Sequence, residues 1–88
     1  ETLKNVAVGA GALNVAFEPV SRRAFVANRD AGTVAVVDLD GNLVANLDLS
    51  PLANHVLADG KGDVLAVNKS RNPDDPNGDR IVRISPAK

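Results

Sequence analysis

The sequence predicts an all-β fold made of two four-stranded antiparallel units, on three observations. Apolar residues form 44% of the chain and are mostly Val, Leu and Ala, with two Phe and no Trp, Tyr, Met or Cys; β-branched Val favours strands. The apolar runs are short and bounded by Gly, Pro, Asp and Asn, as strands are. The pattern of runs and turns recurs after 40 residues, and a repeat of this length is typical of arrays of small sheets.

Four strands are expected in the first half of the chain, over residues 2–8, 12–17, 23–28 and 33–38. Each is a short run bounded by turn residues. The turn before the last of them contains Gly32, which suits a left-handed backbone position.

Four more strands are expected over residues 43–49, 53–58, 63–68 and 80–85. The first follows the tight-turn dipeptide Asp40-Gly41 and alternates apolar and polar residues with a period of two. The other three match the first copy, gaplessly at an offset of 40 residues up to Lys69, after which seven extra residues lengthen the loop before Arg80. No segment keeps a helical period.

Four antiparallel strands in a 40-residue repeat are the blade of a β-propeller. The alternative is an eight-stranded sandwich or barrel, but sandwiches do not usually repeat their sequence in register. We therefore expect residues 1–88 to form two blades of a partial propeller, with one repeat unit over about 1–38 and the second over about 39–88, as part of a larger propeller.

The repeat resembles the YVTN family of propeller repeats. The likeness lies in Asn14-Val15-Ala16-Phe17-Glu18-Pro19, in Ala24-Phe25-Val26-Ala27-Asn28 and in Ala31-Gly32-Thr33-Val34-Ala35-Val36-Val37-Asp38. Phe25 stands where the family has Tyr, Ala27 where it has Thr, and His55 where the first strand of the repeat has Val. The chain is also similar to the C-terminal two blades of YncE-like bacterial periplasmic seven-bladed propellers. That resemblance implies a periplasmic or secreted location and further blades outside these residues.

The order of the expected strands leaves blade edges open at both ends of the chain. If the strands of a blade are a to d from the propeller axis outward, the chain runs d-a-b-c-d-a-b-c. Exposed strand edges recruit other chains. We therefore expect the partner to be other blades of the same protein or a head-to-tail oligomer.

Composition removes several classes of function. The net charge of −1 and the two aromatic residues argue against nucleic acid as a partner. No apolar run approaches the length that spans a membrane. Without Cys the chain has no disulfide and no thiolate nucleophile. The serines lie in turns or at strand ends, away from the single histidine, so we expect no enzyme, no cofactor and no metal site.

Six residues are candidates for ligand contacts. The b–c and d–a loops of a propeller emerge on one face, and the candidates lie at that face: Asn14, Arg29, Asn54, His55, Lys69 and Arg71. The three cations form a rim for an anionic partner, or are ordinary solvated charge. The asparagines and the histidine contact a ligand, or satisfy backbone groups at strand ends.

The lengthened loop, residues 72–79, is polar and contains two prolines. Asp75, Asn77 and Asp79 alternate as in a calcium loop, but the glycine comes too early and no bidentate Glu follows. The loop is thus a solvated segment or a recognition element.

The function expected from the sequence is a non-catalytic scaffold that binds a small molecule or a protein. The alternatives are a fragment of a propeller oxidoreductase subunit and a self-assembling structural piece.

Overall fold

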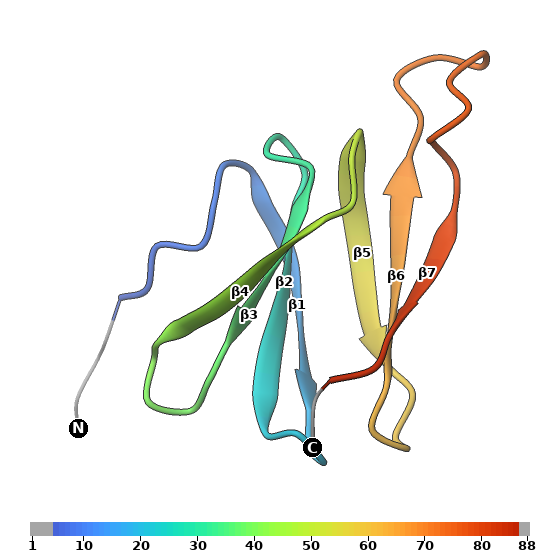
Figure 1. Ribbon diagram of the computed structural model, residues 1–88. Coiled ribbons are helices and arrows are strands. Elements are labelled where there is room, and N and C mark those ends of the chain that lie inside the picture. Colours follow the sequence, from blue (N-terminus) through green and yellow to red (C-terminus); the bar gives the residue numbers. More distant parts are fainter. Residues whose placement is uncertain (1–4, 87–88) are drawn as a thin grey trace.

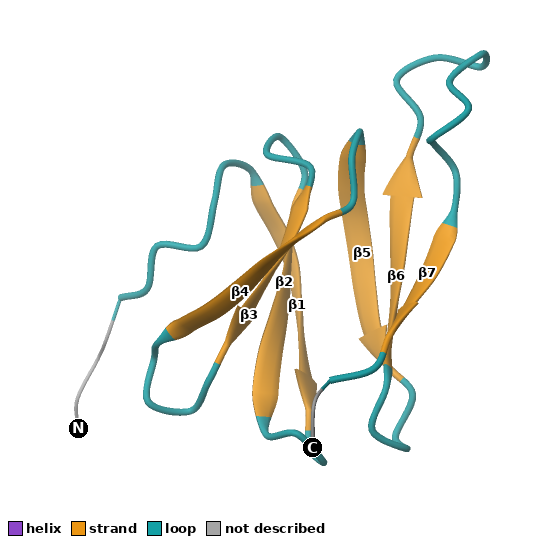
Figure 2. Ribbon diagram, in the orientation of Figure 1, coloured by secondary structure: helices purple, strands orange, loops and turns teal. Residues whose placement is uncertain are grey.

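The computed structural model describes residues 5–86, which form seven β-strands in two antiparallel sheets and contain no helix (Figures 1 and 2). The strands are β1 (Ala12–Glu18), β2 (Arg23–Asn28), β3 (Thr33–Val37), β4 (Leu43–Asp48), β5 (Leu52–Ala58), β6 (Val64–Lys69) and β7 (Ile81–Ile84). Sheet 1 has the order β1-β2-β3-β4, and sheet 2 the order β5-β6-β7. The all-β class is confirmed, and the two sheets divide the chain between Asp48 and Leu52.

The strand expected over residues 2–8 is wrong in its described part. Residues 5–8 form no strand, and residues 2–4 lie outside the described range. Val8 O accepts from the side-chain Nδ2 of Asn28 at 3.1 Å. Directly after this segment, the backbone bonds to the β2–β3 loop: Ala10 O accepts from Ala31 N at 3.1 Å, and Gly11 O from Arg29 N at 2.9 Å. Residues 43–48 were expected in the second repeat unit but pair with β3 in sheet 1. Sheet 2 therefore has three strands within residues 5–86, not the four expected.

The core lies between the two sheets. Sheet 1 contributes Phe25, Val34 and Val36, and sheet 2 contributes Val56 and Val64, all of them buried. β1 and β5 contact each other along their lengths, so the first strands of the two sheets run side by side (Figure 1). Small Val and Ala side chains allow this close face-to-face packing.

The gapless alignment of the two repeats is wrong by one residue where it matches the first strand of sheet 1 with the first strand of sheet 2. Asn14 pairs with Ala27, and His55, not Asn54, pairs with Val67, the counterpart of Ala27. The cause is a shorter turn. Glu18 and Arg23 pair across residues 19–22, whereas Asp59 N donates to Asp63 O at 3.0 Å across residues 60–62 only. A one-residue shift turns every side chain of a strand to the opposite face.

A carboxylate closes each of these two turns. Glu18, fully buried, accepts from Ser21 N at 2.6 Å and from Val20 N at 3.0 Å. Burial alone would raise the pKa of Glu18, but these amide hydrogen bonds lower it overall. Asp59 Oδ1 accepts from Lys61 N at 2.7 Å in the equivalent place. The shorter turn therefore keeps the same capping chemistry with a shorter side chain.

Candidate functional site

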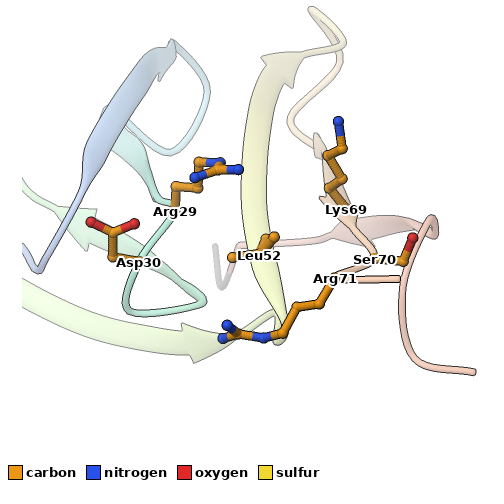
Figure 3. A pocket seen from close by; sticks show the side chains of 6 residues that line it. All are labelled: Arg29, Asp30, Leu52, Lys69, Ser70 and Arg71. Carbon is orange, nitrogen blue, oxygen red and sulfur yellow. The ribbon is translucent and has the colours of Figure 1, made fainter. Parts of the chain in front are cut away.

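A pocket of about 490 Å³ lies at the end of the molecule where β2 joins β3, β4 joins β5 and β6 joins β7. It spans both sheets. Its lining comes from the β2–β3 loop, the start of β5 and the end of β6 with the residues after it: Arg29, Asp30, Leu52, Lys69, Ser70 and Arg71 (Figure 3). We call it the cation pocket, because three of its six lining side chains are cationic. One lining side chain, Asp30, is acidic.

None of the three cations of the pocket lies within ion-pair distance of a carboxylate among residues 5–86. Two carboxylates offset part of their charge: Asp30 in the lining, and Asp79, whose pKa is lowered first by hydrogen bonds from Ser70 and then by the charge of Lys69. Both ion pairs within residues 5–86 belong to Arg83, with Asp59 and Asp63 in the turn at the opposite end of sheet 2. Arg71 makes one long hydrogen bond, from Nη2 to Pro51 O at 3.4 Å. In Figure 3 the side chain of Arg29 points toward β5. The pocket therefore carries an excess of positive charge that is open to an anion.

The loop after β6 is held in place by Asp79. Its Oδ1 accepts from Ser70 N at 3.1 Å and its Oδ2 from Ser70 Oγ at 2.8 Å. These two hydrogen bonds, the backbone one first, keep the pKa of Asp79 below its ordinary value. Gly78 lies so close to Ser70 that a β-carbon there would overlap the Ser70 backbone. The loop thus fixes the backbone on which Lys69 and Arg71 stand.

Asn68, directly before Lys69, is a structural residue. It is fully buried, and its Nδ2 donates to Ser50 O at 2.9 Å and to Asn77 O at 2.7 Å. Its Oδ1 accepts from Arg80 N at 2.8 Å. One side chain therefore joins the β4–β5 connection to the C-terminal part of the β6–β7 loop.

Asn14 lies outside the cation pocket. Its Oδ1 accepts from Val56 N at 2.7 Å, which links β1 to β5 across the two sheets. The side chain is half-buried and engaged in this bond. Of the two roles considered for the asparagines, the satisfaction of a backbone group is the one this geometry gives to Asn14.

Asn54 and His55 also lie outside the cation pocket. Asn54 lines a separate shallow hollow with Lys69 and Arg80 among its neighbours. His55 is exposed on the face of sheet 2 that points away from sheet 1. The structure therefore brings together three of the six candidates, Arg29, Lys69 and Arg71, and places the others elsewhere.

Three lining residues were not among the candidates: Asp30, Leu52 and Ser70. Asp30 and Ser70 are chain neighbours of Arg29 and Lys69, so their place in the loops was a usable signal. Leu52 had none, because an apolar residue at a strand start looks like any core residue.

The described part of the chain also bears on the metal site, the calcium-like loop and the membrane span considered from the sequence. Residues 5–86 contain no group of three or more His, Asp or Glu side chains placed to hold a metal ion. In the 72–79 loop, Asp75 Oδ1 accepts from Asn77 N at 2.9 Å, a local turn bond. No helix in this range is suited to crossing a membrane.

Comparison with known proteins adds no relative. No family model matches the chain, and neither the curated proteins nor the solved structures give a match.

Proposed function

We propose that this chain is a non-catalytic binding module, two blades of a YVTN-type β-propeller, whose cation pocket takes a small anion bearing carboxylate or phosphate groups. The observation that carries the proposal is the gathering of Arg29, Lys69 and Arg71 around one pocket without an ion-pair partner among residues 5–86. Guanidinium and ammonium groups donate charge-assisted hydrogen bonds to both kinds of anion.

Pocket size and position support this proposal. A volume of about 490 Å³ falls within the range of roughly 300–1,000 Å³ that is typical of small-molecule sites. The lining residues come from loops on two rigid sheets, and loops held by a rigid scaffold commonly carry binding residues. Asp30 gives the pocket an acceptor as well, so an anion that also carries hydroxyl groups fits it best.

The blade architecture rests on the repeat. Both sheets begin with antiparallel strands that contain a bulge near the same place, next to Ala12 and next to Ala53. Sheet 1 has four consecutive antiparallel strands, as a blade has. The two sheets pack face to face with their first strands adjacent, which is how neighbouring blades lie around an axis.

The non-catalytic part of the proposal rests on the placement of His55. It is the only histidine of the chain and lies on the outer face of sheet 2, whereas Ser70 lines the pocket. A nucleophile and a base must lie within hydrogen-bond reach of each other. The alternative, a fragment of an oxidoreductase propeller, predicts a bound metal or chromophore in the purified protein. The resemblance to YncE-like propellers supports a periplasmic or secreted location, which cell fractionation tests.

The binding proposal is tested by NMR titration of the ¹⁵N-labelled chain with inorganic phosphate and with citrate. We expect shifts at the amides of residues 29–31, 52 and 69–71. Exposed ion pairs contribute about 0.2–1 kcal/mol each, so Arg29→Ala and Lys69→Ala each weaken binding by up to about fivefold, and the double variant by more.

Lys61→Ala is the matched control, since Lys61 lies exposed in the β5–β6 turn at the other end of the molecule. Its binding constant stays at the wild-type value. Affinity that is unchanged in the double variant, or shifts that cluster away from the pocket, would refute the proposed site.

A further inference from the structure

The two sheets correspond to each other strand by strand once the shorter turn is taken into account. Asn14, Ala27 and Val34 lie in one cross-strand row of sheet 1. His55, Val67 and Ile81 form the equivalent row of sheet 2. The rows match because Asn28 and Asn68 are buried at the same place in the second strand of each sheet. Each face of sheet 1 therefore has a defined counterpart in sheet 2.

The outer face of sheet 2 is the counterpart of a face that sheet 1 buries. Sheet 1 packs Ala16, Phe25, Ala27 and Val34 against sheet 2. The equivalent side chains of sheet 2 point away from sheet 1 and are largely exposed, with Leu57 at 58%, Val67 at 37% and Ile81 at 73%; together with Leu65 and His55 they form what we call the outer face of sheet 2. It is an apolar surface without a covering partner among the described residues.

The outer face of sheet 1 is likewise the counterpart of a face that sheet 2 buries. Val15 corresponds to Val56, which belongs to the core between the sheets, and Phe17 corresponds to Ala58, two residues further along the same face of β5. Val15 is 62% exposed and Phe17 50% exposed. On β3 the same face carries Ala35 and Val37, which are already buried, so the exposed apolar part of this face lies along β1. Exposed apolar patches mark interaction sites in soluble proteins.

We infer that a second copy of this chain docks the outer face of its sheet 1 on the outer face of sheet 2, and so repeats the packing that the two sheets already make within one chain. The interface is heterologous, because two different faces meet, and it continues until a ring closes. Both halves of the required complementarity are present in every copy.

His55 provides the polar contact of this interface. Within the chain, Asn14 Oδ1 accepts from Val56 N across the sheets. His55 occupies the position of Asn14, and Val15 that of Val56. The unprotonated nitrogen of a neutral imidazole is an acceptor, so His55 of one copy accepts from Val15 N of the next. This gives the only histidine of the chain a role that the cation pocket does not use.

The experiment mixes two variants that each spoil one face. Leu57→Asp places a charge on the outer face of sheet 2, and Phe17→Asp places one on the outer face of sheet 1. Both positions are at least half exposed, so each folded monomer tolerates the change, which circular dichroism checks. Sedimentation velocity of the wild-type chain is expected to show a mass that rises with concentration. Each variant alone associates at least about tenfold more weakly, as a charge in the centre of an interface does.

Mixing the two variants is expected to restore association, but only as a capped 1:1 heterodimer, because one intact pair of faces remains. His55→Asn, which copies the contact made by Asn14, keeps wild-type association and covers the case in which an aspartate variant fails to fold. A wild-type chain that stays monomeric at all accessible concentrations overturns the inference. So does an aspartate variant that still forms homodimers, since that result means like faces meet, or a mixture of the variants that stays monomeric.

Discussion

Asn68 gives the sharpest test of how the loop end of this fold is held together. Its side chain makes three hydrogen bonds while fully buried: two donated by Nδ2, to Ser50 O and Asn77 O, and one accepted by Oδ1 from Arg80 N. Each bond contributes about 1 kcal/mol net. Arg80 partly replaces the lost donors in a variant, since its Nε donates to Asn77 O at 2.8 Å and its Nη2 to Ser50 O at 3.4 Å. We therefore expect Asn68→Ala to lower the free energy of unfolding by about 2–3 kcal/mol.

The assay is urea unfolding followed by far-UV circular dichroism, because the chain has no Trp or Tyr. The midpoint falls while the slope of the transition is unchanged, and the melting temperature falls by about 10–20 °C. Asn28→Ala is the matched control. Asn28 is equally buried but makes two hydrogen bonds, to Val8 O and Thr33 Oγ1, and its Oδ1 lacks a partner among the described residues. Asn28→Ala is expected to lower the free energy of unfolding by about 1–2 kcal/mol.

The variant Asn68→Asp tests the contribution of the two donated hydrogen bonds separately from the contribution of side-chain size. It keeps the size of the side chain but turns carboxylate oxygens toward two carbonyls, so it is expected to destabilise at least as much as Asn68→Ala. The reasoning is refuted if Asn28→Ala costs as much as Asn68→Ala, or if Asn68→Asp unfolds at the wild-type urea concentration.

Three further predictions concern other parts of the molecule. Asn14→Ala removes the acceptor of Val56 N between the sheets and costs about 1–2 kcal/mol by urea unfolding. Gly78→Ala forces a methyl group onto the Ser70 backbone; hydrogen exchange then accelerates in the loop but not in sheet 1. Asp59 has its pKa held below the ordinary 3.8, first by the amide hydrogen bond at Lys61 N. Its stabilisation is complete above the unfolded pKa and is lost as the pH falls through the lower folded pKa, so Asp59→Asn flattens the acid limb of stability against pH.

Much of the fold could be predicted because the strands are local features. Short Val-rich and Ala-rich runs between turn residues locate strands whatever their partners, and seven of the eight expected strands are present. The strand over 2–8 was wrong in its described part because pairing is not local. The carbonyl of Val8 accepts from Asn28 Nδ2. No sequence pattern within residues 5–8 predicts this bond, because its donor lies 20 residues away.

The one-residue difference between the two turns could not be predicted either, because it too depends on strand pairing. Sequence identity at Asn14 and Asn54 favoured a gapless alignment, but the register depends on which turn closes the strand pair. The cation pocket was predictable in its charges, since Arg29 and Lys69 follow equivalent strands. The apolar part of the pocket lining could not be predicted, because Leu52 lines the pocket only as a result of the packing of one sheet on the other.

The hydrogen bond between Asn14 and Val56 also has a consequence for the free edge of β5. β5 is an edge strand of sheet 2, and an unsatisfied edge amide is a template on which a foreign strand adds. The side-chain amide of Asn14 occupies Val56 N with a group that cannot continue a ladder, so an incoming strand loses a backbone partner in the middle of the edge. We therefore expect the hydrogen bond from Val56 N to Asn14 to disfavour strand addition along β5.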